Sequence, residues 1–180
     1  ENFYFETIQK VLQVVKIPVS VKISHYFSNL AGMVQKLAST GIAGIVIFNR
    51  FYSPDIDIEN ESVVVADVLS SPNDYHLSLK WTGILSGMID VDLAATTGIH
   101  TSETALKFLL AGASAVQVAS VVYHDGPSAI TRINQDISDW MDKKGYQNIS
   151  DFKGKLSQKA TLAQAWERTQ FMKYFGEKTF

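Results

Sequence analysis

Hydrophobic residues along the chain follow two alternating patterns. In some stretches they recur every three or four positions, as on one face of a helix. Between these lie short runs that are almost entirely apolar, as in strands buried on both faces. The pattern predicts helices over residues 8–15, from an N-cap at Ser28 to Gly41, and over 79–88, 102–111 and 127–144. It predicts core strands over residues 19–23, 42–48, 91–96 and 115–120.

Residues 51–78 interrupt this alternation. The stretches 53–55 and 70–74 are turn signals, and a short strand over 63–68 lies between them. We therefore expect a β-hairpin inserted after the second core strand. The acidic residues of this segment lack the spacing of a calcium-binding loop and are expected on a solvated face: Asp55, Asp57, Glu59 and Glu61.

Strands that alternate with helices form a parallel sheet with right-handed crossovers, so the predicted fold class is α/β. Two architectures fit this order, an open doubly wound sheet and a (β/α) barrel. A dinucleotide-binding sheet needs a G-x-G-x-x-G turn after its first strand, and residues 22–26 (KISHY) contain none. The sequence therefore favours the barrel.

Composition excludes several classes of function. The 180 residues include 16 Lys and Arg against 18 Asp and Glu, and the net charge of −2 argues against non-specific binding to nucleic acid. The chain has no cysteine, which excludes disulfides, thiolate metal sites and a cysteine nucleophile within it. No apolar run approaches the roughly 20 residues of a membrane-spanning helix. Residues 1–6 lack the basic start of a signal peptide, so a cytoplasmic location is expected.

Polar residues at the carboxyl ends of the predicted strands are candidates for chemistry, because a barrel places these ends around its active site. Lys22 stands in an otherwise apolar strand, where an unpaired charge is costly, so we expect it to contact an anionic cofactor or substrate. The alternative is a lysine that reaches solvent from a strand end. Asn49 can offer a donor and an acceptor to a planar heterocycle, or can simply terminate its strand.

Two further strand ends lead into helices. Residues 96–100 (TTGIH) follow one strand, and Ala119-Ser120 ends another. Backbone amides at adjacent strand ends form the usual phosphate site of a barrel. His25 and His100 also fall at this edge and are candidates for acid or base catalysis, although the sequence shows no partner for either. The histidines have no paired spacing, so no metal site is expected.

A combination of segments is more specific than any one of these motifs: residues 21–27, 48–57, 79–81, 97–100, 109–118, 126–127, 140–141, 145–146 and 151–156. Together they resemble the class 1 dihydroorotate dehydrogenase family, and most closely its dihydroorotate dehydrogenase-like branch. The resemblance covers residues 1–160 in register. It implies an FMN-containing (β/α)8 TIM barrel that oxidises dihydroorotate to orotate in pyrimidine biosynthesis.

The resemblance also implies roles for single residues. Lys22 matches the lysine at the pyrimidine end of the flavin, and Asn49 matches an asparagine that holds the substrate ring. Gly98 and the Ala119-Ser120 pair match the loops that bind the flavin phosphate. An earlier Gly-Gly phosphate loop of the family is absent here, and Lys80 stands near its place and is expected to supply charge instead.

Two of the phosphate loops depart from the family pattern. Thr97-Gly98-Ile99 replaces Gly-Gly-Val, and Ala119-Ser120 replaces Gly-Thr. Each added side chain reduces the room for close approach of a phosphate.

The predicted strands correspond to the fifth through eighth of the barrel, and a complete barrel needs about 250 residues. Residues 1–160 are therefore expected to be the C-terminal half of a flavin-binding barrel, and residues 161–180 a helical extension. The catalytic base is expected in an N-terminal half, so no catalytic residue is assigned to this chain. Activity is expected to need that half of the barrel or a second subunit, and a homo-oligomer is expected.

The alternative is a non-catalytic half-barrel that acts as a self-associating or partner-binding module. The two hypotheses share the expected fold and differ in whether flavin binds. The three tryptophans, Trp81, Trp140 and Trp166, stand at helical spacing and are expected in the core. Leu162, Trp166 and Phe171 are expected to dock the extension on the barrel exterior or at a subunit contact.

Overall fold

The computed structural model describes residues 2–161 and 166. Its centre is a four-stranded parallel sheet in the order β1-β2-β5-β6. The strands are β1 (Ser20–Ile23), β2 (Gly44–Ile47), β5 (Asp92–Thr96) and β6 (Ala115–Gln117). A helix lies between each strand and the next, so the α/β alternation expected from the sequence is confirmed.

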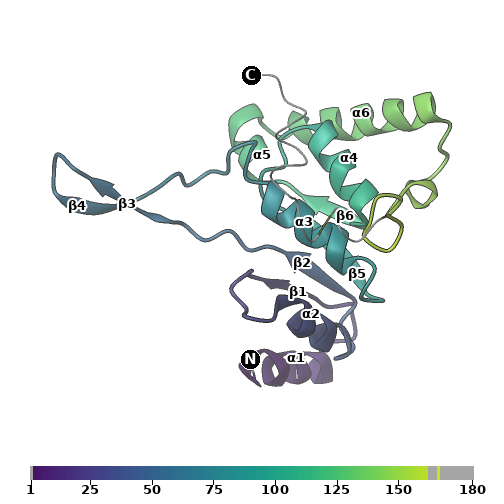
Figure 1. Cartoon of the computed structure of the whole chain (residues 1–180), viewed down its shortest axis with the longest axis horizontal. Coiled ribbons are helices and arrows are strands. Elements are labelled where there is room, and N and C mark those ends of the chain that lie inside the picture. The colour runs from purple at the N-terminus through teal and green to yellow at the C-terminus, as the bar shows by residue number, and fades with distance from the viewer. Residues whose placement is uncertain (1, 162–165, 167–180) are drawn as a thin grey trace, which may run out of the picture.

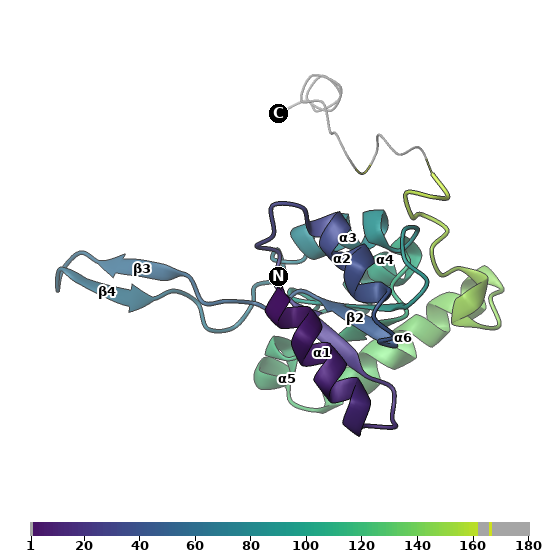
Figure 2. The same ribbon diagram turned by 90° about the horizontal axis from the view of Figure 1, so that it is seen from below.

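Six α-helices accompany the sheet in the described residues (Figure 1). They are α1 (Asn2–Val14), α2 (Leu30–Ala38), α3 (His76–Leu85), α4 (Ser102–Ala111), α5 (Ser120–Asp125) and α6 (Ser128–Lys144), with a 3-10 turn at Ile149–Asp151. Figure 2 shows α2, α3 and α4 together on one side of the sheet. Helix α1 begins six residues before the predicted start, and α3 begins three residues early.

The two faces of the sheet differ. Ile23 and Ile47 are buried under the helices, whereas Lys22 and Gln117 are exposed on the opposite face. Side chains alternate along a strand, and the strand register therefore places one set of residues on this opposite face, small or polar apart from the buried Val46: Ser20, Lys22, Val46, Asp92, Ala94, Thr96, Ala115 and Gln117. In a closed barrel this face would be the interior.

Helix ends follow local hydrogen bonding. The predicted N-cap Ser28 is wrong by one residue, because the side chain of Asn29 accepts the N–H of Gly32 at 3.0 Å. Helix α4 has the predicted bounds and ends at Gly112, whose φ of 115° is left-handed. A Cβ on Gly112 would collide with the side chain of Ser86, so that close approach also needs glycine.

The strand predicted over 115–120 is wrong at its end. Strand β6 stops at Gln117, and Ser120 is the first residue of the short helix α5. Because α5 continues with Val121 and Val122, the sequence keeps the apolar character of a strand where the backbone has already become helical.

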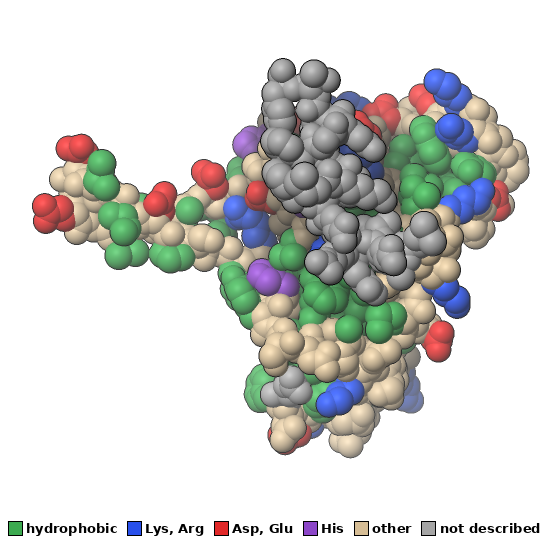
Figure 3. Space-filling model, in the orientation of Figure 1, with side chains coloured by type: hydrophobic (Ala, Val, Ile, Leu, Met, Phe, Trp, Pro, Cys, Tyr) green, Lys and Arg blue, Asp and Glu red, His purple; other side chains and the backbone are tan. Residues whose placement is uncertain are grey.

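The insertion is a hairpin, as expected. Strands β3 (Pro54–Asp57) and β4 (Ser62–Val65) pair antiparallel and project away from the body in both views, and we call residues 54–65 the arm (Figures 1 and 2). The turn expected at 53–55 is instead the start of β3. Pro54, Ile56, Val63 and Val65 share one face of the arm, and Ile56 and Val63 are 68% and 77% exposed. The acidic side chains Asp55 and Asp57 lie on the other face, and Figure 3 shows acidic groups along the arm and at its tip.

The core lies between the sheet and its helices. Its fully buried side chains include Leu37, Ile45, Leu85, Phe108 and Phe152. Trp81 and Trp140 were expected in the core and are half-buried at its margin. Trp166 packs its ring over Gly83 and donates its indole N–H to the carbonyl of Leu156 at 2.9 Å. The predicted contacts of Leu162 and Phe171 lie outside the described residues.

Within residues 2–161, no helix combines the length and the apolar character needed to cross a membrane.

Candidate functional site

A cavity of about 480 Å³ lies where the carboxyl ends of the sheet strands meet the return of the arm. It is lined from β1 by Lys22, after β2 by Asn49, after β5 by residues 96–99 and after β6 by residues 117–120. Lys22, Asn49, Gly98, Ala119 and Ser120, all chosen from the sequence, therefore line one cavity. Lys80 does not line it, because it projects from the exposed side of α3.

Lys22 and Arg50 are the cations that line the cavity, and Arg50 is paired with Asp74 whereas Lys22 is not. The Nζ of Lys22 donates to Oε1 of Gln117 at 3.5 Å, and no carboxylate among the described residues forms an ion pair with it. Its charge therefore remains available to an anionic group in the cavity. Gln117 was not singled out from the sequence, although a polar residue in an apolar strand is the same signal that identified Lys22.

Asn49 stands just beyond β2 and is exposed. Its backbone N–H donates to the carbonyl of Ile23 at 2.7 Å, which continues the pairing of β1 with β2 past the end of the strand. Its side-chain amide has no hydrogen-bond partner in the described part of the chain. The position of Asn49 is thus fixed by its backbone, and Asn49 lines the cavity with an amide that is unpaired among the described residues.

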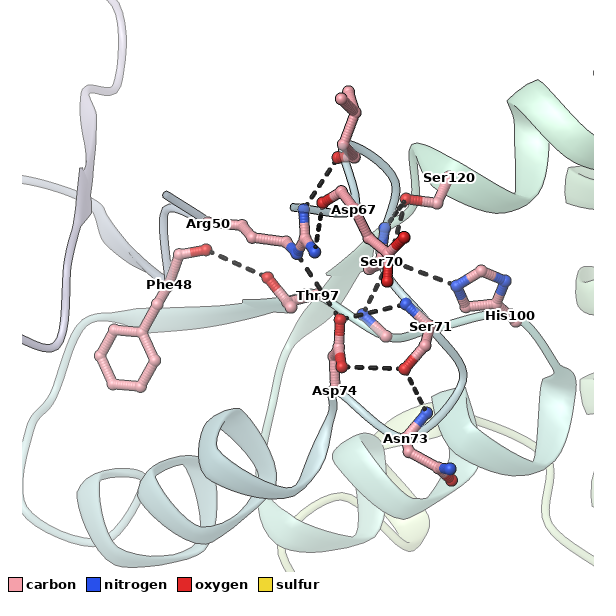
Figure 4. Close-up of polar contacts among 12 residues, drawn as sticks. Phe48, Arg50, Asp67, Ser70, Ser71, Asn73, Asp74, Thr97, His100 and Ser120 are labelled. Atoms are coloured by element: carbon pink, nitrogen blue, oxygen red, sulfur yellow. Dashed lines mark hydrogen bonds and ion pairs between the residues drawn. The ribbon is translucent and has the colours of Figure 1, made fainter. Parts of the chain in front are cut away.

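Arg50 holds the returning end of the arm against the sheet (Figure 4). Its Nη1 and Nη2 atoms donate to the carbonyls of Val68 and Asp67 at 2.8 and 2.9 Å. Its Nε lies 3.6 Å from a carboxylate oxygen of Asp74. Because Val68 and Ser70 form one wall of the cavity, Arg50 shapes that wall. No local pattern in the sequence indicates this role, since the partners are backbone carbonyls 17 and 18 residues away.

Hydroxyl groups gather at the end of the cavity near α5. The backbone N–H and the hydroxyl of Ser70 both donate to Oγ of Ser120, at 2.8 and 2.9 Å. Gly98 N–H donates to Ser70 Oγ at 3.4 Å, and His100 Nε2 lies 3.2 Å from the same oxygen. Ser70 and Ser120 are buried. Ser70 was read from the sequence only as part of a turn.

The backbone at Thr97 and Gly98 turns sharply between β5 and α4. Both residues have positive φ, 82° and 72°. A Cβ on Gly98 would collide with the backbone N of Tyr75, so glycine is required there. Thr97 is a β-branched residue in the left-handed region, which is a strained conformation for it.

The two candidate histidines have different surroundings. His25 packs its ring against Tyr26 and Phe48, with ring centroids 4.1 and 5.8 Å apart, and does not line the cavity. His100 contacts Ser70 from the side away from the cavity, where it lines a neighbouring hollow together with His124. Neither is placed for direct proton transfer to a molecule in the main cavity.

The clear pKa shifts lie outside the cavity. A side-chain hydrogen bond from Asn60 lowers the pKa of Asp57 on the arm. On α4, the hydrogen bond and charge of Lys107 lower the pKa of Glu103, and the same hydrogen bond raises the pKa of Lys107.

The donor set of the cavity fits a flavin mononucleotide. It combines the Lys22 cation, the unpaired Asn49 amide and, at the other end, the Ser120 hydroxyl, which is suited to a phosphate. A volume of about 480 Å³ is within the usual range for organic ligands of this class.

Comparison with known proteins places these features in a family. The catalytic subunit of dihydroorotate dehydrogenase B (NAD(+)) from Pelobacter propionicus is 32% identical over 144 residues, which are 78% of this chain and 47% of that protein. Dihydroorotate dehydrogenase (fumarate) from Lachancea kluyveri is 30% identical over 173 residues, covering 84% of this chain and 52% of that protein. The chain thus spans about half the length of these curated relatives.

Solved structures agree on the fold. The ligand-free dihydroorotate dehydrogenase of Eimeria tenella superposes with a TM-score of 0.59 at 25% identity, over 75% of this chain and 38% of that one. This confirms the expected partial barrel. The family model described as dihydroorotate dehydrogenase matches residues 1–141, and the chain therefore belongs to the dihydroorotate dehydrogenase family.

Proposed function

We propose that this chain is the C-terminal half of an FMN-dependent oxidoreductase that oxidises dihydroorotate to orotate in pyrimidine biosynthesis. One observation carries the proposal: Lys22, Asn49, Gly98 and the Ala119-Ser120 pair come from four different strand ends and line the same cavity. Relatives named dihydroorotate dehydrogenase support the same class of reaction.

Lys22 and Asn49 would serve the reacting end of the site. FMN, when bound, supplies the hydride acceptor for a CH–CH oxidation. A cation at the pyrimidine end of the flavin stabilises the negative charge that reduction places there, and Lys22 has no carboxylate partner among the described residues that would cancel its effect. Asn49 would orient the substrate ring with one donor and one acceptor, because its amide has no other partner among the described residues.

Gly98, Ala119 and Ser120 would hold the phosphate end. The hydroxyl of Ser120 is the donor at this end of the cavity, and the backbone N–H of Gly98 is spent on Ser70 Oγ beside it. Ala119 contributes a small side chain beside them. Lys80 is the weakest of the predicted cofactor ligands, since it does not line this cavity.

The remaining machinery would come from another polypeptide segment. We propose that the base which removes the substrate proton lies in an N-terminal half of the barrel, and that this chain alone is inactive. Strands β1 and β6 are the two outer strands of the sheet, and within the described residues each offers an unpaired edge to such a half. We further propose a cytoplasmic location and a homo-oligomer.

One feature favours a second candidate, a self-associating or partner-binding module without turnover. The apolar face of the arm is exposed, and an isolated two-stranded hairpin is marginally stable in water. The enzymatic candidate also allows a partner on this face. Flavin binding therefore decides between the two candidates, because only the enzyme requires it.

The deciding experiment is a titration of the purified chain with FMN, followed by flavin absorbance and fluorescence and by the mass in solution. The enzymatic proposal expects a yellow complex, and expects dihydroorotate oxidation only after the N-terminal half of a relative's barrel is added. A colourless 19.9 kDa monomer that acquires no flavin spectrum would exclude it.

A further inference from the structure

The hydroxyl protons at the phosphate end of the cavity can be assigned from their partners. Ser120 Oγ accepts two hydrogen bonds, one from the N–H and one from the hydroxyl of Ser70. A hydroxyl oxygen has two acceptor positions, so both are filled. The proton of Ser120 has no acceptor within residues 2–161 and remains for a group in the cavity, which Ser120 lines.

The same count of donors and acceptors shows which atom donates in the contact between His100 and Ser70. Ser70 uses its only hydroxyl proton on Ser120, so its contact with His100 requires an N–H on the histidine. His100 Nε2 is therefore the donor, and together with Gly98 N–H it fills the acceptor positions of Ser70. A chain of hydrogen bonds runs from His100 through Ser70 to Ser120, in one direction (Figure 4).

We propose that Ser70 and His100 are positioning residues that orient the Ser120 hydroxyl to donate to the phosphate of flavin mononucleotide. This role rests on the flavin-binding function proposed above. Neither residue needs to touch the ligand: His100 stands behind Ser70, and Ser70 blocks the acceptor side of Ser120.

The physical gain is preorganisation. A free serine hydroxyl rotates among several directions and can present either its proton or its lone pairs to an anion. With both acceptor positions filled, Ser120 can present only its proton, and no reorganisation is needed when the anion arrives. A hydrogen bond to an anionic oxygen is about twice as strong as one between neutral groups.

The test compares FMN with riboflavin, which lacks only the phosphate, by quenching of flavin fluorescence. Wild-type chain is expected to bind FMN more tightly than riboflavin. Ser120→Ala is expected to reduce this preference by roughly ten-fold or more, the loss of a hydrogen bond to a charged group. Ser70→Ala and His100→Leu leave the Ser120 hydroxyl in place but no longer oriented, and each is expected to reduce the preference by a smaller factor, roughly three-fold or more. The affinity of all three variants for riboflavin is expected to stay within about two-fold, since that ligand makes no contact at this end.

Two variants separate positioning from folding. His100→Gln keeps an N–H donor near the Nε2 position and is expected to retain the preference for FMN. His124→Leu changes a neighbouring histidine, whose ring centre lies 6.2 Å from that of His100, without touching Ser70, and is the matched control for His100→Leu. Thermal unfolding of each variant checks that the fold is intact.

The outcomes are distinguishable. If His100→Leu keeps the preference for FMN, or weakens FMN and riboflavin equally, the positioning role is wrong. If wild-type chain binds the two flavins equally, the phosphate is not held here and the role is again wrong, while flavin binding stands. If neither flavin binds, the proposed function fails and this role fails with it.

Discussion

Lys22 Nζ lies 3.5 Å from Gln117 Oε1, although the two residues belong to the two outer strands of the four-stranded sheet. In a flat sheet, three strand spacings of about 4.8 Å would separate these strands by roughly 14 Å. Two long side chains can meet over that distance only when both point inward from a curved sheet. The contact therefore shows that the four-stranded sheet is curved as in a barrel, although it has only half of the barrel strands.

Lys22→Ala is expected to impair flavin reduction far more than folding. The side chain is exposed, so its removal leaves the core unchanged, but the negative charge on reduced flavin loses its cation. We expect reduction by dihydroorotate to slow about 100-fold in the reconstituted barrel, measured by stopped-flow absorbance, with an unchanged thermal midpoint. Lys80→Ala, on the exposed side of α3, is the matched control. Equal rates for Lys22→Ala and wild type would remove the assigned role.

Thr97→Gly is expected to stabilise the protein. Thr97 has a φ of 82°, and a β-branched residue in that region costs of order 1–3 kcal/mol, more than the entropy that glycine loses on folding. We expect a gain of about 1 kcal/mol in the free energy of unfolding, measured by urea denaturation. Thr97→Ala keeps the Cβ and is expected to recover less. A loss of stability in the glycine variant would show that the hydroxyl of Thr97, 3.4 Å from the carbonyl of Phe48, matters more than the strain.

Arg50→Lys is expected to loosen the returning end of the arm. A single ammonium group cannot reproduce the fork that bonds the carbonyls of Asp67 and Val68 at once. Limited proteolysis should therefore cut near residues 67–70 several times faster than in wild type, and FMN should bind more weakly because the cavity wall moves. Arg132→Lys, at an exposed ion pair on α6, is the control. Unchanged proteolysis would mean that other contacts hold this segment.

Glu103 and Lys107 give α4 a pH-dependent contribution. The pKa of Glu103 is lowered from 4.5 by Lys107, so its stabilising effect is present above pH 4.5 and is lost as the pH falls through the lowered value. The pKa of Lys107 is raised from 10.5, so its part is lost only as the pH rises beyond that value. The thermal midpoint of Glu103→Gln is expected to lie slightly below wild type at pH 7 and to match it in strong acid. Glu6→Gln on α1 serves as control, and a difference that persists in strong acid would contradict the ion-pair explanation.

The arm offers a direct test of self-association, because the chain contains no cysteine. Val63 lies on the apolar face of the arm, and Val64, its neighbour, on the acidic face. If two copies pack their apolar faces together, Val63→Cys should form a disulfide-linked dimer under mild oxidation and Val64→Cys should not. Non-reducing gel electrophoresis would show the difference. Equal cross-linking of both variants, or of neither, would rule out pairing through this face.

Much of the fold could be predicted because hydrophobic spacing decides between strand and helix. Helix α4 has the bounds expected from its pattern, and β2 is buried on both faces as an all-apolar strand should be. The predicted strand over residues 115–120 extends too far, and the error has a physical cause. Val121 and Val122 favour a strand locally, but Ser120 bonds to Ser70, 50 residues away, and that long-range contact accompanies the change to helix α5.

The residues of the site also fall into those that the sequence predicted and those that it did not. Lys22 and Asn49 were predictable because each is a polar residue at the end of an apolar strand. Arg50 and Ser70 were not assigned roles, since their partners are distant backbone and hydroxyl groups that no local pattern reveals. Lys80 was expected near the phosphate end from its place in the family pattern, but it is exposed on α3 and does not line the cavity.

Strands β1 and β6 have no further pairing strand within the described residues, so each edge can pair with an added strand of one preferred direction. Both strands are parallel to their neighbours, so an added strand must run the same way to continue the ladder. Association with another half-barrel would therefore change the hydrogen exchange of backbone amides at both edges. Backbone amides in Ser20–Ile23 and Ala115–Gln117 that exchange readily with deuterated water in the isolated chain should become slow to exchange when the missing strands pair with them.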